Sequence, residues 1–427
     1  MAGSPAAGFL LASLMRNQWK SPEALNRIRV AKTRRLLIHA FETVPFYRSR
    51  FQAAGADPYE FKTMEDLGRF PLVSKEDLRD RAVEDVTSAS MDRRRCEQFS
   101  TSGATGVPLR SFFDRRDSML KNLAWIRVFL NSGMKPWHKA AAFMGSRNVK
   151  SGRSWYEFLG LWRRCEISTW SPPSCWIEAL RIWQPQVLLG YVMTLKVLAD
   201  HMGRNGHAGV RPKLIFHSSA VLDSLSRNFL EERLGGTIID IYGSDEAGCI
   251  AWECRVCRGY HISADMLVVE VLKNGRPVAP GESGEVVVTN LHSFAMPFIR
   301  YRQNDMVTLA SRRPVCGRRF PLIEMIEGRI DDFITLENGR KLSPHPVYHA
   351  IDPVPGINRW KLTQESRDCL VLEIEPGAAF DPESERLILD NLRTLTEGNL
   401  RVHILLRENL PIDPGSKFRT VTSKVRE

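Results

Sequence analysis

The spacing of apolar residues along this chain changes from one region to the next. Residues 22–50 mix polar and apolar positions at helical spacing and predict a helix that ends near Pro45. The same period predicts a long helix over 116–131 and a shorter one over 176–183. The short apolar run 187–190 is typical of a buried strand. The middle of the chain therefore alternates helices with short strands.

The clearest unit lies between residues 213 and 241. Two apolar strands, 213–217 and 237–241, flank a helix that Asp223 would cap and Gly235 would end. Strand, helix and strand at this spacing predict a parallel sheet with crossover helices. Ligands of such sheets bind at the carboxyl ends of the strands, where this chain has Ser218-Ser219-Ala220 and Tyr242-Gly243-Ser244-Asp245-Glu246.

From residue 266 onward the pattern is all-β, with strands expected over 266–272, 285–290 and 306–310. After Gly328 it becomes mixed α+β for about 100 residues. We therefore expect an α/β fold. A large N-terminal domain, residues 1–328, would combine parallel-sheet subdomains with a β-rich subdomain, and a small mobile α+β domain would occupy 329–427.

Composition adds limits to this picture. The chain has 427 residues, 43% of them hydrophobic and 26% charged, so it can bury a large core without disulfides. No apolar run is long enough to predict a transmembrane helix. The apolar stretch 8–15 lacks a preceding basic region and is not read as a signal peptide, so the expected compartment is the cytoplasm.

The formal net charge of +11 leaves two interpretations, a nucleic-acid partner or a polyanionic small substrate. The densest basic clusters, 93–95 and 312–319, are short and contain few aromatic residues. We therefore expect no nucleic-acid partner and favour a substrate such as ATP or coenzyme A.

Hydroxyl residues and glycines alternate over residues 100–108, Ser-Thr-Ser-Gly-Ala-Thr-Gly-Val-Pro. Such a loop brings backbone N–H groups and hydroxyls close to an anion. It is not a Walker A loop, because no Gly-Lys-Ser/Thr follows. Alone, the pattern fits either a phosphate loop or a flexible linker.

This loop resembles the phosphate loop of the adenylate-forming superfamily, and four further segments resemble its other motifs in the expected order: 242–246, 300–305, 328–332 and 414–419. Within the superfamily, the chain is most similar to the phenylacetate–CoA ligase and CapK-like branch, on the strength of residues 44–47 and 189–191.

The resemblance implies roles for individual residues. Glu246 would bind Mg²⁺, Asp305 would accept hydrogen bonds from the ribose, and Arg329 would reach the ribose or a phosphate. Lys417 would contact the reacting carboxylate and the α-phosphate as a mobile point charge, and Asp331 would act as the hinge. The remaining expected ATP-binding residues are Thr101, Ser102, Gly103, Ala104, Thr105 and Gly106 at the β- and γ-phosphates, Ser218, Ser219, Ala220 and Tyr242 beside the adenine, and Gly243, Ser244 and Asp245.

The activity implied is ATP-dependent activation of an aryl or arylacetic acid as acyl-AMP, followed by transfer to coenzyme A. Two alternatives remain open: transfer to an amine or carrier-protein thiol, and a catalytically degenerate, zinc-stabilised scaffold. The second is motivated by departures from the family motifs, among them Val107, Asp245, Asn304 and the order Gly415-Ser416. A homodimer is also compatible with the sequence.

A second group of residues predicts a metal. Cys254 and Cys257 form a CxxC pair, His261 follows, and Cys316 could complete a tetrahedral Cys₃His zinc site. Ligation by protein alone implies a structural zinc ion, and the alternative is four unrelated loop residues. Phe143 and Tyr191 lie where the branch lines its acid pocket, and both fit core positions equally well.

Overall fold

The computed structural model describes residues 5–100, 109–145, 155–204, 209–218, 221–377, 379–398, 400–408, 410 and 420–425. The chain divides into two compact units, each built from separate stretches of sequence. The first unit comprises Met1–Pro136, Ile239–Gln303 and Val307–Met325, and the second comprises Trp137–Ile238, Asn304–Met306 and Ile326–Glu427. None of the described helices is both long enough and apolar enough to cross a bilayer.

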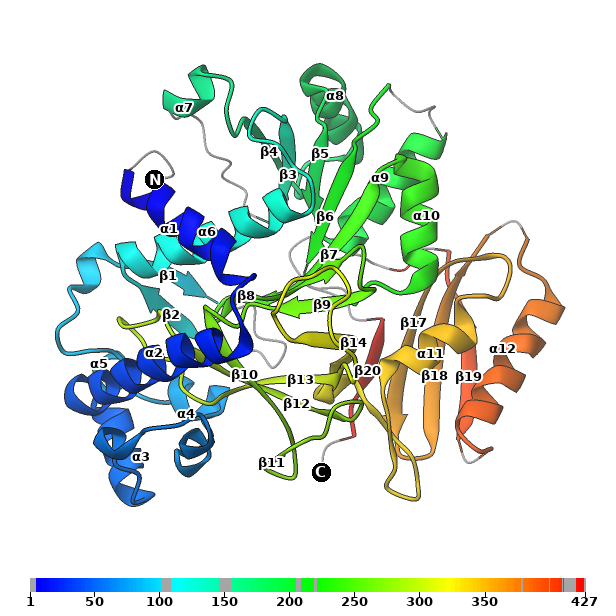
Figure 1. Cartoon of the computed structure of the whole chain (residues 1–427). Helices are drawn as coiled ribbons and strands as arrows, with labels where there is room; N and C mark the ends of the chain where they lie inside the picture. The colour runs from blue at the N-terminus through cyan, green and yellow to red at the C-terminus, as the bar shows by residue number, and fades with distance from the viewer. Residues whose placement is uncertain are drawn as a thin grey trace. The chain divides into compact units, whose positions relative to one another are not determined.

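The first unit begins with helices that pack on a mainly antiparallel sheet (Figure 1). Its helices are α1 (Pro5–Asn17), α2 (Pro22–Thr43), α3 (Pro45–Ala53), α4 (Lys75–Arg79), α5 (Val83–Val86) and α6 (Arg115–Asn131), with β1 (Glu97–Ser100) and β2 (Arg110–Phe113) forming a separate antiparallel pair. The long helix expected over 116–131 is confirmed. The helix expected to end near Pro45 is confirmed as α2, which ends at Thr43, and Pro45 occupies the first turn of α3.

The strands that lie wholly or partly in the first unit follow the order β11-β10-β12-β13-β14-β9-β8-β7, and β7, β13 and β14 also include residues assigned to the second unit. Their bounds are β7 (Thr237–Ser244), β8 (Gly248–Cys254), β9 (Gly259–Ile262), β10 (Leu267–Lys273), β11 (Arg276–Pro277), β12 (Ser283–Asn290), β13 (Tyr301–Leu309) and β14 (Leu322–Arg329). The sequence predicted β7 to end at Ile241. It continues to Ser244 because β8 pairs with it in antiparallel register.

The second unit contains strands that pair in parallel in the order β6-β5-β3-β4, so the predicted parallel sheet is confirmed. These are β3 (Ala140–Met144), β4 (Arg164–Ser168), β5 (Val187–Gly190) and β6 (Leu214–Ser218), with helices α7 (Trp155–Phe158), α8 (Pro173–Trp183), α9 (Val192–Arg204) and α10 (Ser224–Leu234). Asp223 caps α10 through Ser226 N, and Gly235 ends it at φ 75°, as expected.

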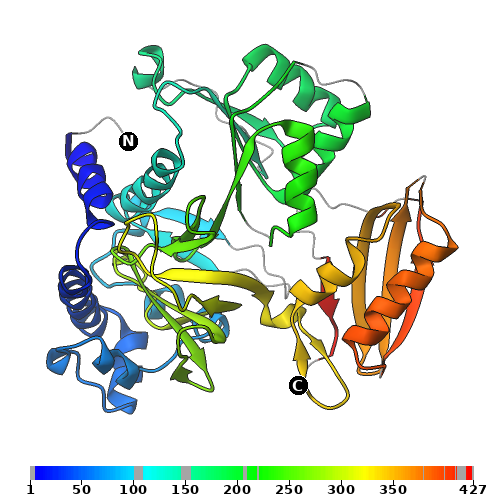
Figure 2. The same ribbon diagram turned by 45° about the vertical axis from the view of Figure 1, so that its right-hand side comes forward.

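Residues after 328 form an α+β element with its own core. A four-stranded sheet, in the order β19-β18-β17-β20, carries α11 and α12 on one face (Figures 1 and 2). The bounds are β15 (Ile334–Thr335), β16 (Lys341–Leu342), α11 (Pro344–Ile351), β17 (Ile357–Ser366), β18 (Cys369–Pro376), α12 (Pro382–Leu395), β19 (Arg401–Leu406) and β20 (Val421–Ser423). The α/β class is therefore confirmed, while the proposed boundary at 328 stays a prediction.

Candidate active site

The segment 242–246 lies at the end of β7 and in its turn to β8. A register shift, or β-bulge, separates Tyr242 from Gly243. A Cβ on Gly243 would lie 2.4 Å from the carbonyl oxygen of Gly248, so a side chain cannot be placed there without moving the backbone. The turn is further held by Ser244, whose hydroxyl accepts the Ala247 N–H at 3.1 Å. The bulge and this hydrogen bond thus constrain the backbone that carries Asp245 and Glu246.

Glu246 is the buried acidic residue of this turn, with 7% of its surface exposed. Burial, aided by the neighbouring Asp245 carboxylate, raises the pKa of Glu246 above its ordinary value. The Tyr301 hydroxyl donates to Glu246 Oε1 at 3.2 Å, and the Asn290 side chain donates to the Glu246 carbonyl at 2.9 Å. A buried carboxylate is suited to a divalent cation, because the cation takes oxygen ligands and compensates their buried negative charge.

Tyr301 is itself firmly placed. It begins β13, it forms a parallel bridge with Val73, and its ring packs edge-on against Phe298 at 5.3 Å. The preceding residue, Arg300, makes two hydrogen bonds to the Glu270 carboxylate and donates to the carbonyl of Phe70. These contacts fix the start of β13, and hence the hydroxyl that faces Glu246.

Lys121 of α6 also reaches this turn. Its ammonium donates to the Asp245 carbonyl at 2.5 Å and lies against the rings of Phe99 and Phe113. Burial lowers the pKa of the Lys121 ammonium, although Asp245 and Glu246 oppose the shift. Sequence reasoning missed Lys121, Asn290 and Tyr301 as partners of the motif, because each reaches it from a distant part of the chain.

In the second unit, the structure brings together two of the residues expected at the nucleotide. Asp305 lies on β13 and Arg329 at the end of β14, and Arg329 Nε is 3.7 Å from Asp305 Oδ1. Asp305 is thus held by a strand and is not in a turn. Asp331, the expected hinge, is exposed in the short 3₁₀ helix Ile330–Asp332 that follows β14.

Ser218 is half-buried at the end of β6, where the parallel-sheet rule predicted it. Phe143, on β3, is buried in a core cluster and packs edge-on against Trp176 at 5.4 Å. Tyr191, just after β5, is 39% exposed. The loop residues Thr101 to Gly106, with Ser219, Ala220 and Lys417, lie outside the described residues.

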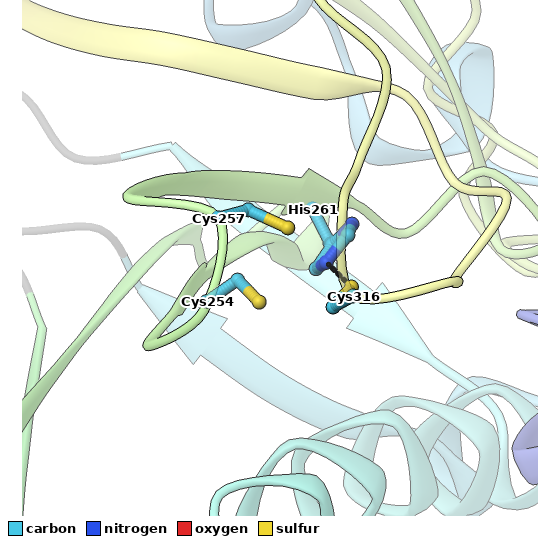
Figure 3. Close-up of side chains that lie close together, drawn as sticks. All are labelled: Cys254, Cys257, His261 and Cys316. Atoms are coloured by element: carbon cyan, nitrogen blue, oxygen red, sulfur yellow. Dashed lines mark hydrogen bonds between the residues drawn. The ribbon is translucent and has the colours of Figure 1, made fainter.

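The predicted metal ligands converge in the first unit. Cys254 ends β8, Cys257 lies in the following turn, His261 is on β9, and Cys316 comes from the loop before β14. Figure 3 shows the four side chains pointing toward one another, and their ligand atoms all lie within 4.8 Å of one another. His261 Nε2 is 3.3 Å from Cys316 Sγ.

This group fits a zinc ion. Tetrahedral zinc, with Zn–S and Zn–N bonds of about 2.3 and 2.0 Å, places its ligand atoms roughly 3.6 Å apart. Burial, together with Arg318, lowers the pKa of His261 to about 4 and so favours the neutral imidazole that binds metals. Burial raises the pKa of Cys257 to about 11, so zinc would have to displace that proton.

The metal-ligand loop is tied to the N-terminal helices. Arg318 Nε donates to the Gln18 side chain at 3.0 Å, and the Arg319 N–H donates to the Gln18 carbonyl at 2.7 Å. The Arg318 guanidinium also lies over the Trp19 ring at 5.2 Å. The loop that carries Cys316 therefore also anchors the link between α1 and α2.

Known proteins resemble this chain in sequence and in fold. No protein-family model matches the chain. The chain is 28% identical to phenylacetate-coenzyme A ligase of Thermus thermophilus over 408 residues, covering 90% of this chain and 88% of that protein. It is 28% identical to the ligase of the same name from Escherichia coli over 327 residues, covering 73% of this chain and 74% of that protein. Protein CapK of Staphylococcus aureus is 22% identical over 282 residues, which cover 64% of this chain and 61% of CapK.

Solved structures show the same fold. A 2-hydroxyisobutyryl-CoA ligase, crystallised in its postadenylation state with an acyl-AMP, superposes with a TM-score of 0.81. That match covers 96% of this chain and 91% of the ligase chain at 21% identity. The order of the motifs, the curated relatives and the fold agree: the chain is similar to the phenylacetate–CoA ligases and to CapK, and it has the fold of a CoA ligase that was solved with an acyl-AMP.

Proposed function

We propose that this protein is an AMP-forming acid–thiol ligase that activates a carboxylic acid with ATP and transfers the acyl group to coenzyme A. The observation that carries the proposal is Glu246, a buried carboxylate that Tyr301 and Asn290 hold in the turn resembling the family's Tyr-Gly-x-Thr-Glu motif. The similarity to phenylacetate-coenzyme A ligases, over 90% of the chain in one case, supports the reaction class.

The reaction has two displacements. A carboxylate oxygen of the acid attacks the α-phosphorus of ATP, and the bond to the β-phosphate oxygen breaks, so that pyrophosphate leaves and acyl-AMP remains. The sulfur of coenzyme A then attacks the acyl carbon, AMP leaves, and the thiol proton passes to solvent. Both steps depend on positioning and on neutralising phosphate charge.

The residues divide this work. Glu246 would hold Mg²⁺, which neutralises phosphate charge when bound. Asp305 would accept hydrogen bonds from the ribose, and Arg329, already beside it, would keep that carboxylate in place. Residues 101–106 would hold the β- and γ-phosphates. Lys417 would approach the α-phosphate for the first step and withdraw for the second.

The acid is proposed to be aryl or arylacetic. Four of the curated relatives are phenylacetate-coenzyme A ligases. Phe143 packs beside Gly190 at the end of β5, because a Cβ added to Gly190 would lie 3.3 Å from the Phe143 ring. The cluster of Cys254, Cys257, His261 and Cys316 is proposed to hold a structural zinc ion. The cytoplasmic compartment and a homodimer stay predictions.

The test is carboxylate-dependent exchange between ATP and labelled pyrophosphate, over aryl, arylacetic and aliphatic acids without an acceptor. We expect exchange with aryl or arylacetic acids, and acyl-CoA once coenzyme A is added. Glu246→Gln should lose most of the exchange, whereas the exposed Glu232→Gln should keep it. Exchange without acyl-CoA formation would favour an amine or carrier-protein acceptor. No exchange with any acid, by folded protein, would contradict the proposal.

A further inference from the structure

Lys121 lies where α6 meets the turn that carries Glu246. Its Nζ donates to the Asp245 carbonyl at 2.5 Å. The same Nζ lies 4.6 Å from the centre of the Phe99 ring and 4.3 Å from that of Phe113. A cation between two aromatic faces loses much of its positional freedom, and each face contributes about 0.5–2 kcal/mol of attraction. Lys121 is therefore a fixed hydrogen-bond donor to the turn.

The two rings belong to the strands on either side of residues 101–108. Phe99 is on β1 and Phe113 on β2, and the two strands pair from Glu97↔Phe113 to Ser100↔Arg110. Lys121 thus connects this strand pair to the 242–246 turn, which carries Glu246.

The stem of Lys121 is also packed against the turn. A Cβ on Gly248 would lie 3.0 Å from Lys121 Cγ, so Gly248 leaves the space that this stem occupies. Among the described residues, the Asp245 carbonyl is the hydrogen-bond acceptor that the ammonium reaches, although the carboxylates of Asp245 and Glu246 are both close enough to act on its charge. The ammonium thus binds a backbone carbonyl of the turn, and the Glu246 carboxylate stays available to bind a metal ion.

We propose that Lys121 is a positioning residue for the magnesium-dependent step: by holding the Asp245 carbonyl against the β1–β2 pair, it orients the Glu246 carboxylate toward Mg·ATP. Lys121 acts through the turn and does not touch the phosphates. This inference rests on the proposed function, because it assigns a task to the same site.

Two variants separate the donor from the packing. Lys121→Met keeps an apolar stem between Phe99 and Phe113 but removes the donor, and Lys121→Arg keeps both a donor and a charge. Lys62→Met, at an exposed lysine of the same unit, is the matched control. Isothermal titration would measure the affinity of each protein for Mg·ATP and for metal-free ATP in chelator, with no acid present.

We define the magnesium gain as the affinity for Mg·ATP divided by the affinity for metal-free ATP. For wild-type protein and Lys62→Met we expect the same magnesium gain. Lys121→Met should lose about tenfold of that gain, the order of one hydrogen bond from a charged donor. Its affinity for metal-free ATP should not change, and Lys121→Arg should recover most of the loss. Equal weakening with and without Mg²⁺ would show direct phosphate contact and overturn the proposal. A lowered Tm with an unchanged magnesium gain would show a purely structural role and also overturn it.

A double variant tests whether Lys121 acts through Glu246. In Glu246→Gln protein, adding Lys121→Met should change the magnesium gain little, because the carboxylate that Lys121 positions is already gone. Fully additive losses would contradict the inference. The proposed function and the role of Lys121 are tested separately: no exchange by wild-type protein would contradict the proposed function, whereas normal exchange and an unchanged magnesium gain in Lys121→Met would contradict only the role of Lys121.

Discussion

The Glu246 carboxylate is buried beside the Tyr301 hydroxyl. Burial disfavours its charged form, and hydrogen bonds from its own backbone N–H and from Tyr301 partly offset that cost. The same burial, together with the Glu246 charge, raises the pKa of Tyr301 far above its ordinary value, so the hydroxyl stays a donor at every working pH. Two residues thus set the charge at the centre of the proposed site.

Removing that donor gives a clean test. Tyr301→Phe should lower pyrophosphate exchange about tenfold, because a hydrogen bond to a charged group contributes roughly 1.5–3 kcal/mol. The loss should be smaller at higher pH, where the Glu246 carboxylate ionises without help. The measurement is exchange rate from pH 6 to 9, and a loss that is equal at every pH would contradict this account of Tyr301.

Asp117 offers a second test, of stability and not of activity. Its carboxylate is buried, and it accepts the N–H groups of Phe294 and Ala295 at 3.2 and 3.4 Å. Burial, then the charge of Asp114, raises the pKa of Asp117 to about 7. Because the folded pKa is above the unfolded one, this group stabilises the fold at low pH, and that contribution is lost as pH rises through 7.

Asp117→Asn should therefore gain stability relative to wild type between pH 4 and 7, by up to about 1.4 kcal/mol per pH unit, with no further gain above that range. Urea unfolding of both proteins at pH 5 and pH 8 would measure it. A difference that is the same at both pH values would show that Asp117 is already ionised in the fold.

At the scale of elements, the β7–β8 hairpin shows what the sequence can and cannot predict. The sequence motif was enough to select Glu246 as a candidate magnesium ligand, because the resemblance depends on residue types alone. The end of β7 was misplaced by three residues, since pairing with β8 and the bulge at Gly243 depend on the partner strand. Lys121 and Tyr301, 124 and 55 residues from their partners, have no local signal.

The hairpin leads to a third prediction. Gly243→Ala should destabilise the protein by about 1–3 kcal/mol and abolish most exchange, because the new Cβ would collide with the Gly248 carbonyl. Gly68→Ala, where a Cβ would meet no atom within 4 Å, is the matched control. Thermal unfolding and pyrophosphate exchange measure both effects, and wild-type behaviour of Gly243→Ala would mean that the turn is less constrained than its geometry indicates.

The turn between β8 and β9 leads to a fourth prediction, which concerns bound zinc. Protein purified without added metal should contain about one equivalent of zinc, and a strong chelator should lower its Tm by about 5 °C or more. Cys254→Ser should lose the metal, while Cys175→Ser, at an exposed cysteine, should retain it. Metal analysis measures the zinc content and thermal scans measure the Tm. A metal-free protein with an unchanged Tm would exclude the structural zinc site.

At the scale of the whole molecule, the α/β class and the parallel strand group were predictable, because periodicity and short connections determine them. The grouping of residues into units was not. Residues 326–427 group with 137–238, far away in sequence, and such grouping arises from contacts that a linear pattern does not contain.

The fifth prediction concerns the two half-reactions. Lys417→Ala should abolish formation of acyl-AMP, while transfer from supplied acyl-AMP to coenzyme A should stay near the wild-type rate, because the family resemblance assigns this lysine to the first step alone. Single-turnover assays of each half-reaction would measure both rates. Equal loss in both would contradict an alternation between two arrangements of the C-terminal region.

The metal-ligand group also bears on how the chain folds. Cys257 and Cys316 are separated by about 60 residues, and this stretch includes β9 to β13, with Asn290, Tyr301 and Asp305. A metal ion that joins its ends in the unfolded chain closes a loop whose entropy cost, by analogy with a disulfide, is about 4 kcal/mol. Zinc binding would offset that entropy cost before the strands pair. The strands would then find their antiparallel register within a loop whose ends the metal already holds together. Zinc present during refolding should therefore accelerate recovery of the native hairpins.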